Sequence, residues 1–345
     1  MTADNRSYKK SSFGPAFFFL GKRRREALAD YYEFCRRMDD IADEPDVPAP
    51  EKELDAWAAE ISRVYEGTPR TDLGRRLTRD VKNFGISRDR FLLLIEGMRA
   101  DLQGRSYRTQ RELEWYLYRV AVIVGCATLD ILGVKGRAAD ELSLQLGSAV
   151  QLTNIIRDVH DDAALGRVYL PQDMLAAFGL TRTDVLEGKK PRELAALLAA
   201  LAETADGFYA RAFKQMKKFP RLKMLPCRVM GYVYVKNLAK IRATDFHFIR
   251  PVKLTKGEKL KSIGYALIKT IFCPFIACVC DVFVGPVRSG GRRQTNRFFV
   301  PGKRQKSFFR QGIPAGAGHV YPLFKAGPGQ CGSAAFAGGR TADAG

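Results

Sequence analysis

Two acidic motifs stand out in this sequence of 345 residues, because each holds two aspartates four positions apart. Asp39 and Asp43 form one pair, and Asp158 and Asp162 form the other. Side chains four residues apart project from the same face of an α-helix. Hard divalent cations prefer carboxylate oxygen, and Mg²⁺ is commonly held by one or two carboxylates together with substrate phosphates. Two such pairs on facing helices predict a cluster of Mg²⁺ ions that binds a diphosphate.

Each motif also has a simpler interpretation, in which the aspartates form a solvated acidic face or a network of salt bridges. Arg36 lies one turn before Asp39 and could pair with it, and Arg157 directly precedes Asp158. Two like charges four residues apart repel each other in an isolated helix. Because both motifs lie among apolar residues and each has an arginine beside it, a binding site is favoured over a solvated face.

The segments that carry both motifs have the pattern of long α-helices. Apolar residues recur at three- and four-residue steps, as at Val120, Val124, Ala127 and Ile131, and no alternating run typical of a strand competes with them. Glycine and proline fall mostly between the helical segments. The predicted fold class is therefore all-α, with helices long enough to form a deep bundle. The predicted helices cover residues 22–42, 51–65, 88–102, 109–132, 138–164, 192–217 and 225–243.

The charge of the chain is unevenly distributed. The sequence holds 57 Lys and Arg against 37 Asp and Glu, a net charge of +20. Residues 286–345 contribute +9 of this, with ten basic residues and one acid, and they are rich in Gly, Pro and Ala. We therefore predict an all-α domain at residues 1–285 and a poorly ordered basic tail at residues 286–345. The excess of positive charge suggests an anionic partner, which could be nucleic acid, a lipid surface or a phosphorylated substrate.

Cysteine content and hydropathy indicate where in the cell the protein is located. Seven cysteines are an odd number without zinc-site spacing, and the N-terminus lacks a secretory signal, so we predict reduced thiols and a cytoplasmic location. No run reaches the roughly 18 uninterrupted apolar residues of a membrane span. Residues 270–284 are apolar apart from Asp281. They predict a buried last helix or an interfacial contact, so peripheral contact with the inner face of the membrane is an alternative location.

Several longer motifs extend over most of the chain. They are SSF (11–13), YxFCRxxDDxxDE (32–44), IEGMxxDL (95–102), YLYRVAxxVG (116–125), QLTNIIRDVxxD (151–162) and GRxYLP (166–171). Together they resemble the motifs of one known family, the squalene/phytoene synthases, which join prenyl diphosphates head to head, and the resemblance runs from about residue 11 to about residue 269. The resemblance implies a single isoprenoid-synthase helical bundle with a central cavity. It also implies a reaction in which one allylic diphosphate ionises, its C1 cation attacks the double bond of a second molecule, and a cyclopropylcarbinyl diphosphate forms.

The resemblance assigns roles position by position. The four aspartates match the family's metal-bridging residues, and we expect them to be metal ligands and catalytic residues. Tyr116 and Tyr169 match further catalytic positions, although ordinary core packing with a satisfied hydroxyl is the alternative for each tyrosine. The matching substrate-binding positions are Ser12, Phe13, Tyr32, Arg36, Gln151, Asn154, Arg157 and Tyr234. Aromatic and apolar walls would exclude water and stabilise a carbocation through their π faces.

Within the family, the local sequence of these segments favours the condensation of two farnesyl diphosphates to presqualene diphosphate. A phytoene synthase acting on two geranylgeranyl diphosphates is the alternative. A head-to-tail prenyltransferase or terpene cyclase is less favoured, because it would lack the Gln-x-x-Asn-x-x-Arg-Asp setting of residues 151–158. A basic binding protein that acts through its tail would leave both aspartate motifs unexplained.

The resemblance also fixes the expected cofactor and partners. The cofactor is Mg²⁺, with Mn²⁺ as a substitute, and the partners are prenyl diphosphate substrates and not nucleic acid. No NADPH is expected, because GPGQCG at residues 327–332 matches a dinucleotide-binding pattern only in its letters, without a strand before it or a helix after it.

The sequence departs from the family's pattern at three places. Relatives often carry Gly-Glu between the two aspartates of the second motif, where this chain has His160-Asp161. Many relatives carry glycine where this chain has Val122, and the loss of a small residue there could narrow the cavity or shift the packing of the helix. The chain after residue 270 does not resemble the family at all. A functional extension and a shifted reading frame would both produce that loss of resemblance.

Overall fold

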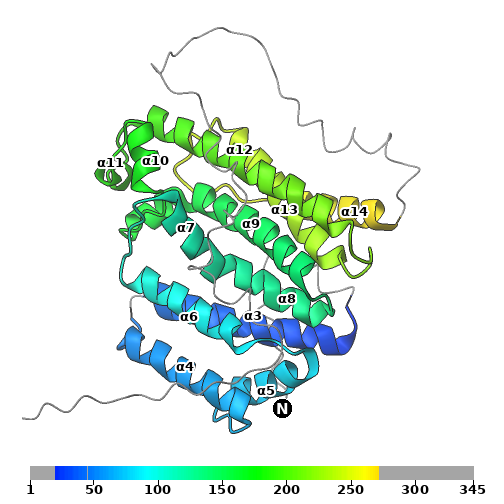
Figure 1. Cartoon of the computed structure of the whole chain (residues 1–345). Helices are drawn as coiled ribbons and strands as arrows, with labels where there is room; N and C mark the ends of the chain where they lie inside the picture. The colour runs from blue at the N-terminus through cyan, green and yellow to red at the C-terminus, as the bar shows by residue number, and fades with distance from the viewer. Residues whose placement is uncertain (1–19, 45, 272–345) are drawn as a thin grey trace, which may run out of the picture. The chain divides into compact units, whose positions relative to one another are not determined.

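The computed structural model describes residues 20–44 and 46–271, and every regular element within these two ranges is a helix (Figure 1). The described residues contain no strand, so the predicted all-α fold class is confirmed. The elements are α3 (Lys22–Asp43), α4 (Pro50–Glu66), α5 (Asp72–Phe84), α6 (Arg88–Leu102), α7 (Gln110–Leu117), the π-helical turn η1 (Tyr118–Val122), α8 (Ile123–Leu132), α9 (Arg137–Ala164), α10 (Gln172–Ala177), α11 (Arg182–Leu186), α12 (Pro191–Met216), α13 (Leu225–Arg242) and α14 (Lys256–Ile271).

Local sequence signals explain where several helices begin and end. The Thr71 hydroxyl accepts a hydrogen bond from the Gly74 N–H at 2.9 Å and caps α5, and Thr109 caps α7 in the same way. Helix α8 is capped at its C-terminus by Gly133, whose φ of 72° lies in the left-handed region that glycine adopts without strain. The next helix, α9, begins four residues later, so α8 and α9 are joined by a short connection.

The long helix α9 lies at the centre of the bundle (Figure 1). It packs against α12 and α13 on one side and against η1 and α8 on another. Leu152 and Ile156 of α9 are completely buried, and a hydroxyl contact of 2.8 Å between Thr153 and Tyr209 joins α9 to α12. Helices α3 to α6 pack together as a second group, and α3 and α6 also contact α8. One continuous apolar core connects the two groups.

A π-helical turn interrupts the helix that the sequence predicts as continuous over residues 109–132. This turn, η1, packs closely against α9 at Gly147. A Cβ atom on Gly147 would lie 2.9 Å from the Cα of Val122 and 3.0 Å from the carbonyl of Ala121, closer than side chains tolerate. The contact therefore depends on the absence of a side chain at this position of α9.

The same stretch is apolar enough to cross a membrane by length and composition alone. Residues 110–132 form a helix of 23 residues, and 56% of its most apolar window is buried inside the bundle. The core helix of a bundle has the same composition. The stretch contains five charged residues, and the two in its more apolar part, Arg119 and Asp130, each form an ion pair. Its neighbours on several sides are other helices of the bundle.

The predicted helices agree with the structure over most of the described chain. Six of the seven match to within one residue at each end, and the seventh contains the π-helical turn. Helices α5 and α14 and the short helices α10 and α11 were not predicted. In α5 the buried residues Leu73, Leu77 and Val81 recur at four-residue steps, but charged residues separate them. The predicted boundary between residues 285 and 286, the basic tail and residues 272–284 lie outside the described residues.

Candidate active site

A cavity of about 500 Å³ lies inside the bundle, lined by α3, α6, α7, η1, α8, α9 and α13 and by the loop after α9. All the predicted site residues within the described ranges line this cavity: Asp39, Asp43, Asp158, Asp162, Tyr116, Tyr169, Tyr32, Arg36, Gln151, Asn154, Arg157 and Tyr234. Ser12 and Phe13 lie outside the described residues. Val122 is buried and does not line the cavity, so this departure from the family's pattern affects helix packing rather than cavity width.

The two acidic motifs end the helices that carry them. Helix α3 ends at Asp43, and α9 ends two residues after Asp162. Neither helix has a basic residue in its last turn. The carboxyls therefore gather at one end of the cavity, which we call the acidic mouth and define as Asp39, Asp43, Asp158 and Asp162.

Burial and mutual repulsion change the titration of two carboxyls in the acidic mouth. The pKa of Asp39 is raised to about 7, chiefly by burial and then by the charge of Asp43. The pKa of Asp162 is also raised to about 7, chiefly by burial and then by the charge of Asp158. Asp43 contributes to the raised pKa of Asp162 as well, so the carboxyls of α3 and α9 act on one another electrostatically.

Two arginines neutralise the other two carboxyls of the mouth. Arg167, in the loop after α9, forms an ion pair with Asp43 at 2.5 Å and donates a hydrogen bond to the Ala42 carbonyl at 2.7 Å. Arg157 donates two hydrogen bonds to the neighbouring carboxylate of Asp158, at 2.8 Å and 2.5 Å. Both arginines line the cavity, so a bound anion would find their positive charges within the mouth.

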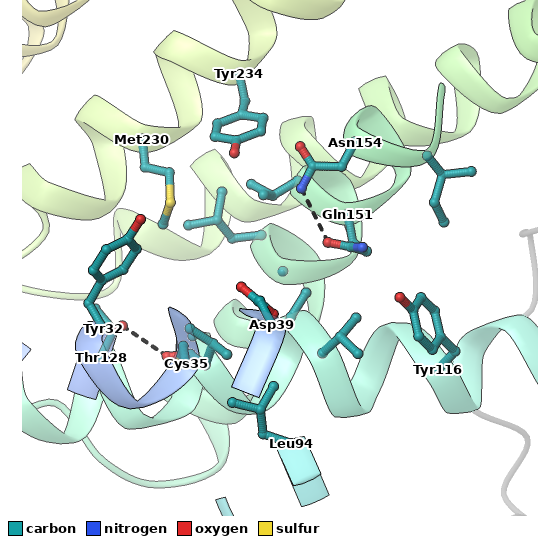
Figure 2. A pocket seen from close by; sticks show the side chains of 18 of the residues that line it. Tyr32, Cys35, Asp39, Leu94, Tyr116, Thr128, Gln151, Asn154, Met230 and Tyr234 are labelled. Carbon is teal, nitrogen blue, oxygen red and sulfur yellow. Dashed lines mark hydrogen bonds between the residues drawn. The ribbon is translucent and has the colours of Figure 1, made fainter. Parts of the chain in front are cut away.

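The expected pairing of Arg36 with Asp39 was wrong. Arg36 pairs instead with Asp40, at 2.8 Å, one full turn along α3. The difference arises because Asp39 points into the cavity (Figure 2), whereas the side chain of Arg36 is 56% exposed and reaches Asp40. Arg36 still lowers the pKa of Asp39 through its charge, although burial and Asp43 outweigh it.

A buried carboxyl and two tyrosines form the wall beside the mouth. Asp101, near the end of α6, accepts hydrogen bonds from the hydroxyls of Tyr116 at 3.1 Å and Tyr169 at 2.9 Å. The two rings stack with centroids 4.9 Å apart, and Tyr107 packs against both. Burial raises the pKa of Asp101 to about 6, and the hydrogen bonds from the tyrosines oppose the rise. Asp101 thereby holds both tyrosines in fixed orientations at the cavity wall.

The opposite wall is polar and comes from α9 and α13. Asn154 donates a hydrogen bond to the Gln151 side chain at 3.2 Å, and the Tyr234 hydroxyl points into the cavity beside Asn154 (Figure 2). Hydrogen bonds from Arg157 and Asn154 act on the Tyr234 hydroxyl, whose pKa burial nevertheless raises. This wall offers amide and hydroxyl groups next to the arginine that pairs with Asp158.

The end of the cavity away from the mouth is largely apolar. It is lined by Leu28 of α3, Leu129 of α8, Leu142 of α9 and Cys227 of α13, and all four are buried. Cys35, Cys126 and Cys227 are free thiols. The cavity thus has a charged end and a hydrocarbon-like end, as an amphipathic ligand requires.

The residues of the mouth fit a hard divalent cation that arrives with a phosphorylated ligand. Within the described ranges, no three His, Cys, Asp or Glu side chains stand close enough to hold an ion by themselves. Mg²⁺ usually takes one or two carboxylates and completes its shell with water and substrate phosphates, so a preformed cage is not required. Asp39 and Asp162 form no ion pair within the described part of the chain, and burial, together with the charge of a neighbouring aspartate, raises the pKa of both.

Two residues of this site were missed by reasoning from the sequence. Asp101 and Arg167 lie within the quoted motifs IEGMxxDL and GRxYLP, but neither received a role. Their partners lie far away in the sequence, 124 positions in the case of Arg167 and Asp43. For Arg167, the signal that could have pointed to it is a single charged residue in the otherwise apolar and aromatic segment 167–171.

Comparison with known proteins agrees with the resemblance. The family model described as squalene/phytoene synthase matches residues 7–258. The presqualene diphosphate synthase of Rhodopseudomonas palustris is 37% identical over 264 residues, which cover 75% of this chain and 94% of that protein. The chloroplastic phytoene synthase 2 of Solanum lycopersicum is 33% identical over 270 residues, which cover 74% of this chain and 87% of that protein.

Solved structures show the same architecture. A dehydrosqualene synthase in complex with a ligand superposes with a TM-score of 0.68 and 28% identity, covering 76% of this chain and 93% of that one. The squalene synthase HpnC from Alicyclobacillus acidocaldarius superposes with a TM-score of 0.65 and 26% identity, covering 71% of this chain and 92% of that one.

Proposed function

This chain belongs to the squalene/phytoene synthase family and is a prenyltransferase, and we propose that it condenses two farnesyl diphosphates head to head into presqualene diphosphate with Mg²⁺ as its cofactor. The observation that carries the proposal is the polarity of a single cavity. One end gathers four carboxylates and two arginines, and the other end is apolar. A prenyl diphosphate has the same division into a charged head and a hydrocarbon tail.

The acidic mouth is where the diphosphate head would bind. Asp39, Asp43, Asp158 and Asp162 would hold Mg²⁺, and Arg157 and Arg167 would contact phosphate oxygens. The chemistry that bound Mg²⁺ supplies is neutralisation of the diphosphate as the C–O bond of the first substrate breaks. Each arginine is already positioned by an aspartate of the mouth, so its charge lies at the cavity before a substrate arrives.

The walls of the cavity would protect the carbocation that ionisation leaves behind. Tyr116 and Tyr169 line the cavity, and their hydroxyls are engaged by Asp101, which fixes the orientation of both rings. Aromatic faces stabilise cations, and a wall without free water keeps the cation from being captured as an alcohol. The buried leucines further inside would hold the two hydrocarbon chains side by side.

The first test is product identification with purified protein and Mg²⁺. Farnesyl diphosphate should yield presqualene diphosphate without NADPH, detected by mass spectrometry, and EDTA should abolish the product. Geranylgeranyl diphosphate is the matched alternative substrate, because the chain is also 33% identical to a phytoene synthase. Phytoene from the C20 substrate, with little product from the C15 substrate, would overturn the substrate assignment and leave the family reaction intact.

A further inference from the structure

The end of the bundle away from the acidic mouth is strongly basic. Three segments meet there: the start of α3 (22–25), the connection between α8 and α9 (134–137) and the connection between α12 and α13 (217–223). Together they hold ten Lys and Arg and no Asp or Glu. Nine of the ten are exposed, and Arg25 is half-buried. We call these three segments the basic end.

Specific contacts bring the three segments together. Arg24 donates a hydrogen bond to the Ile131 carbonyl at 3.2 Å, and Lys223 donates one to the Gly133 carbonyl at 3.4 Å. On the same side of the bundle, Gln215 donates a hydrogen bond to the Ala138 carbonyl at 3.1 Å and ties the end of α12 to the start of α9. The basic end is therefore one surface composed of segments more than 190 positions apart in the sequence.

Ordinary helix capping accounts for only part of this charge. Arg24 and Lys223 satisfy carbonyls at the end of α8, and two further cations have acidic neighbours in Lys22–Glu26 and Arg137–Glu141. Capping does not explain the exposed cations on the connection between α12 and α13, where Lys217 and Lys218 stand next to each other. Like charges gathered on a surface repel one another, and an anionic partner relieves that repulsion.

An exposed apolar side chain lies in the middle of these cations. Leu222 is 71% exposed and is flanked by Arg221 and Lys223. A leucine among basic residues suits the boundary of an anionic bilayer, where the cations meet headgroups and the leucine enters the acyl region. The phosphates of a nucleic acid would interact with the cations alone and would leave the leucine in water.

The basic end also covers the apolar end of the cavity. Leu28 lies one turn beyond the basic start of α3, Leu129 lies one turn before the end of α8, and Cys227 lies in the first turn of α13. Helix α14 runs antiparallel to α13, with Glu258 paired to Lys240 and Tyr265 beside Tyr232, so the chain leaves the described part toward this same end. The sequence that follows, 272–284, is apolar apart from Asp281.

We propose that the basic end is a docking surface for a membrane that contains anionic lipid. The surface lies at the opposite end of the cavity from the acidic mouth, so docking leaves the mouth open to water and brings the apolar end of the cavity nearest to the bilayer. This inference goes beyond the proposed reaction, and lipid binding can be measured without turnover.

The test is co-sedimentation of the full chain with vesicles of phosphatidylcholine and phosphatidylglycerol in equal parts. The patch variant R23Q/K217Q/K218Q removes three exposed cations of the basic end whose side chains form no hydrogen bond or ion pair within the described residues. The control variant K52Q/R111Q/R192Q removes three exposed cations at the starts of α4, α7 and α12 and has the same net charge. Both variants keep residues 272–345, so any contribution of the tail is equal in the two proteins.

We expect the patch variant to bind at least about tenfold more weakly than the control variant, and added salt to weaken binding of the unmodified protein. Leu222→Ser should weaken binding without changing the net charge. Equal binding by the two triple variants would overturn the proposal, as would equal binding to vesicles of pure phosphatidylcholine. Binding to a DNA duplex that depends on the same three cations, without binding to vesicles, would also overturn it in favour of a nucleic-acid surface.

Discussion

The four carboxyls of the acidic mouth differ in what neutralises them. Asp43 and Asp158 each have an arginine partner, whereas Asp39 and Asp162 depend on partial protonation. A bound cation would therefore stabilise the charged forms of Asp39 and Asp162 more than those of Asp43 and Asp158. Loss of charge at Asp39 or Asp162 should therefore lower activity while leaving the fold stable.

The first prediction concerns Asp39→Asn. Turnover should fall at least about 100-fold, because metal-assisted charge stabilisation contributes several kcal/mol to catalysis. The fold should persist, since burial already penalises the charged form of this side chain. Steady-state kinetics and circular dichroism would measure the two effects. The matched control is Asp40→Asn, which removes a carboxylate from the same helix that pairs with Arg36 and does not itself line the cavity. Near-normal activity of the Asp39 variant would contradict the metal assignment.

The second prediction concerns pH. The folded pKa of about 7 for Asp39 and Asp162 exceeds the ordinary value of about 4, so the metal-free chain binds more protons when folded than when unfolded between these values. Their contribution to stability is therefore greatest at low pH and is lost as pH rises through about 7. Metal binding requires the deprotonated carboxylates, so the affinity for the metal increases as pH rises through about 7.

The half-saturating Mg²⁺ concentration for turnover should accordingly fall at least about tenfold between pH 6 and pH 8. The affinity of Mg²⁺ for the free diphosphate substrate, measured over the same range, serves as the control for titration of the substrate itself. A pH dependence no steeper than that control would show that the carboxyls of the mouth do not titrate near neutrality.

Single residues also show how far the sequence could predict the site. The two aspartate pairs could be found from their types and spacing, and most of the other predicted site residues came from the resemblance of continuous motifs to the family. Asp101 and Arg167 act through partners in other helices, and no local pattern indicates which distant side chain a buried charge will meet. The pairing of Arg36 with Asp40 was missed because both candidate partners lie within one turn, and only the direction of the cavity decides between them.

Helix boundaries were predictable wherever apolar periodicity was unbroken. Helices α6 and α13 are examples, whereas α5 alternates its buried residues with charged ones and was missed. The π-helical turn η1 has no local signature, because it depends on close packing against Gly147 of α9. Irregular helical turns of this kind arise from tertiary contacts, and they often occur at functional sites. Here Val120 and Ala121 of the turn line the cavity.

The third prediction tests that contact with Gly147→Ala. The new methyl group would meet backbone atoms of η1, which cannot rotate away as a side chain could. The free energy of unfolding should fall by about 1–3 kcal/mol in urea titrations. Gly207→Ala is the control, because that methyl group would meet only the flexible end of Arg211 and should be neutral or stabilising by up to about 1 kcal/mol. Equal effects of the two substitutions would contradict the role given to Gly147.

The fourth prediction concerns the whole molecule and combines the proposed reaction with the proposed docking surface. An apolar product held beneath the basic end should leave more readily when a bilayer is present. Vesicles with phosphatidylglycerol should therefore raise kcat of the unmodified protein and of K52Q/R111Q/R192Q, and should raise that of R23Q/K217Q/K218Q much less. An equal increase in all three proteins would mean that the lipid acts on the product in solution and not through docking.

The two helices that end at the acidic mouth have a consequence for the whole chain. The aligned peptide groups of a helix place roughly half a negative charge at its C-terminus. Helices α3 and α9 both direct that end toward the mouth, and no basic residue in either last turn offsets it. Folding thus concentrates helix dipoles and carboxylates of the same sign in one place.

Mg²⁺ without substrate should therefore raise the midpoint of thermal unfolding more than NaCl at the same ionic strength, and Asp162→Asn should reduce that difference. Identical shifts with the two salts would show that screening by ionic strength alone explains the stabilisation. The divalent ion would then stabilise the folded chain by relieving the repulsion among the carboxylates and the negative helix ends that folding brings together at the mouth.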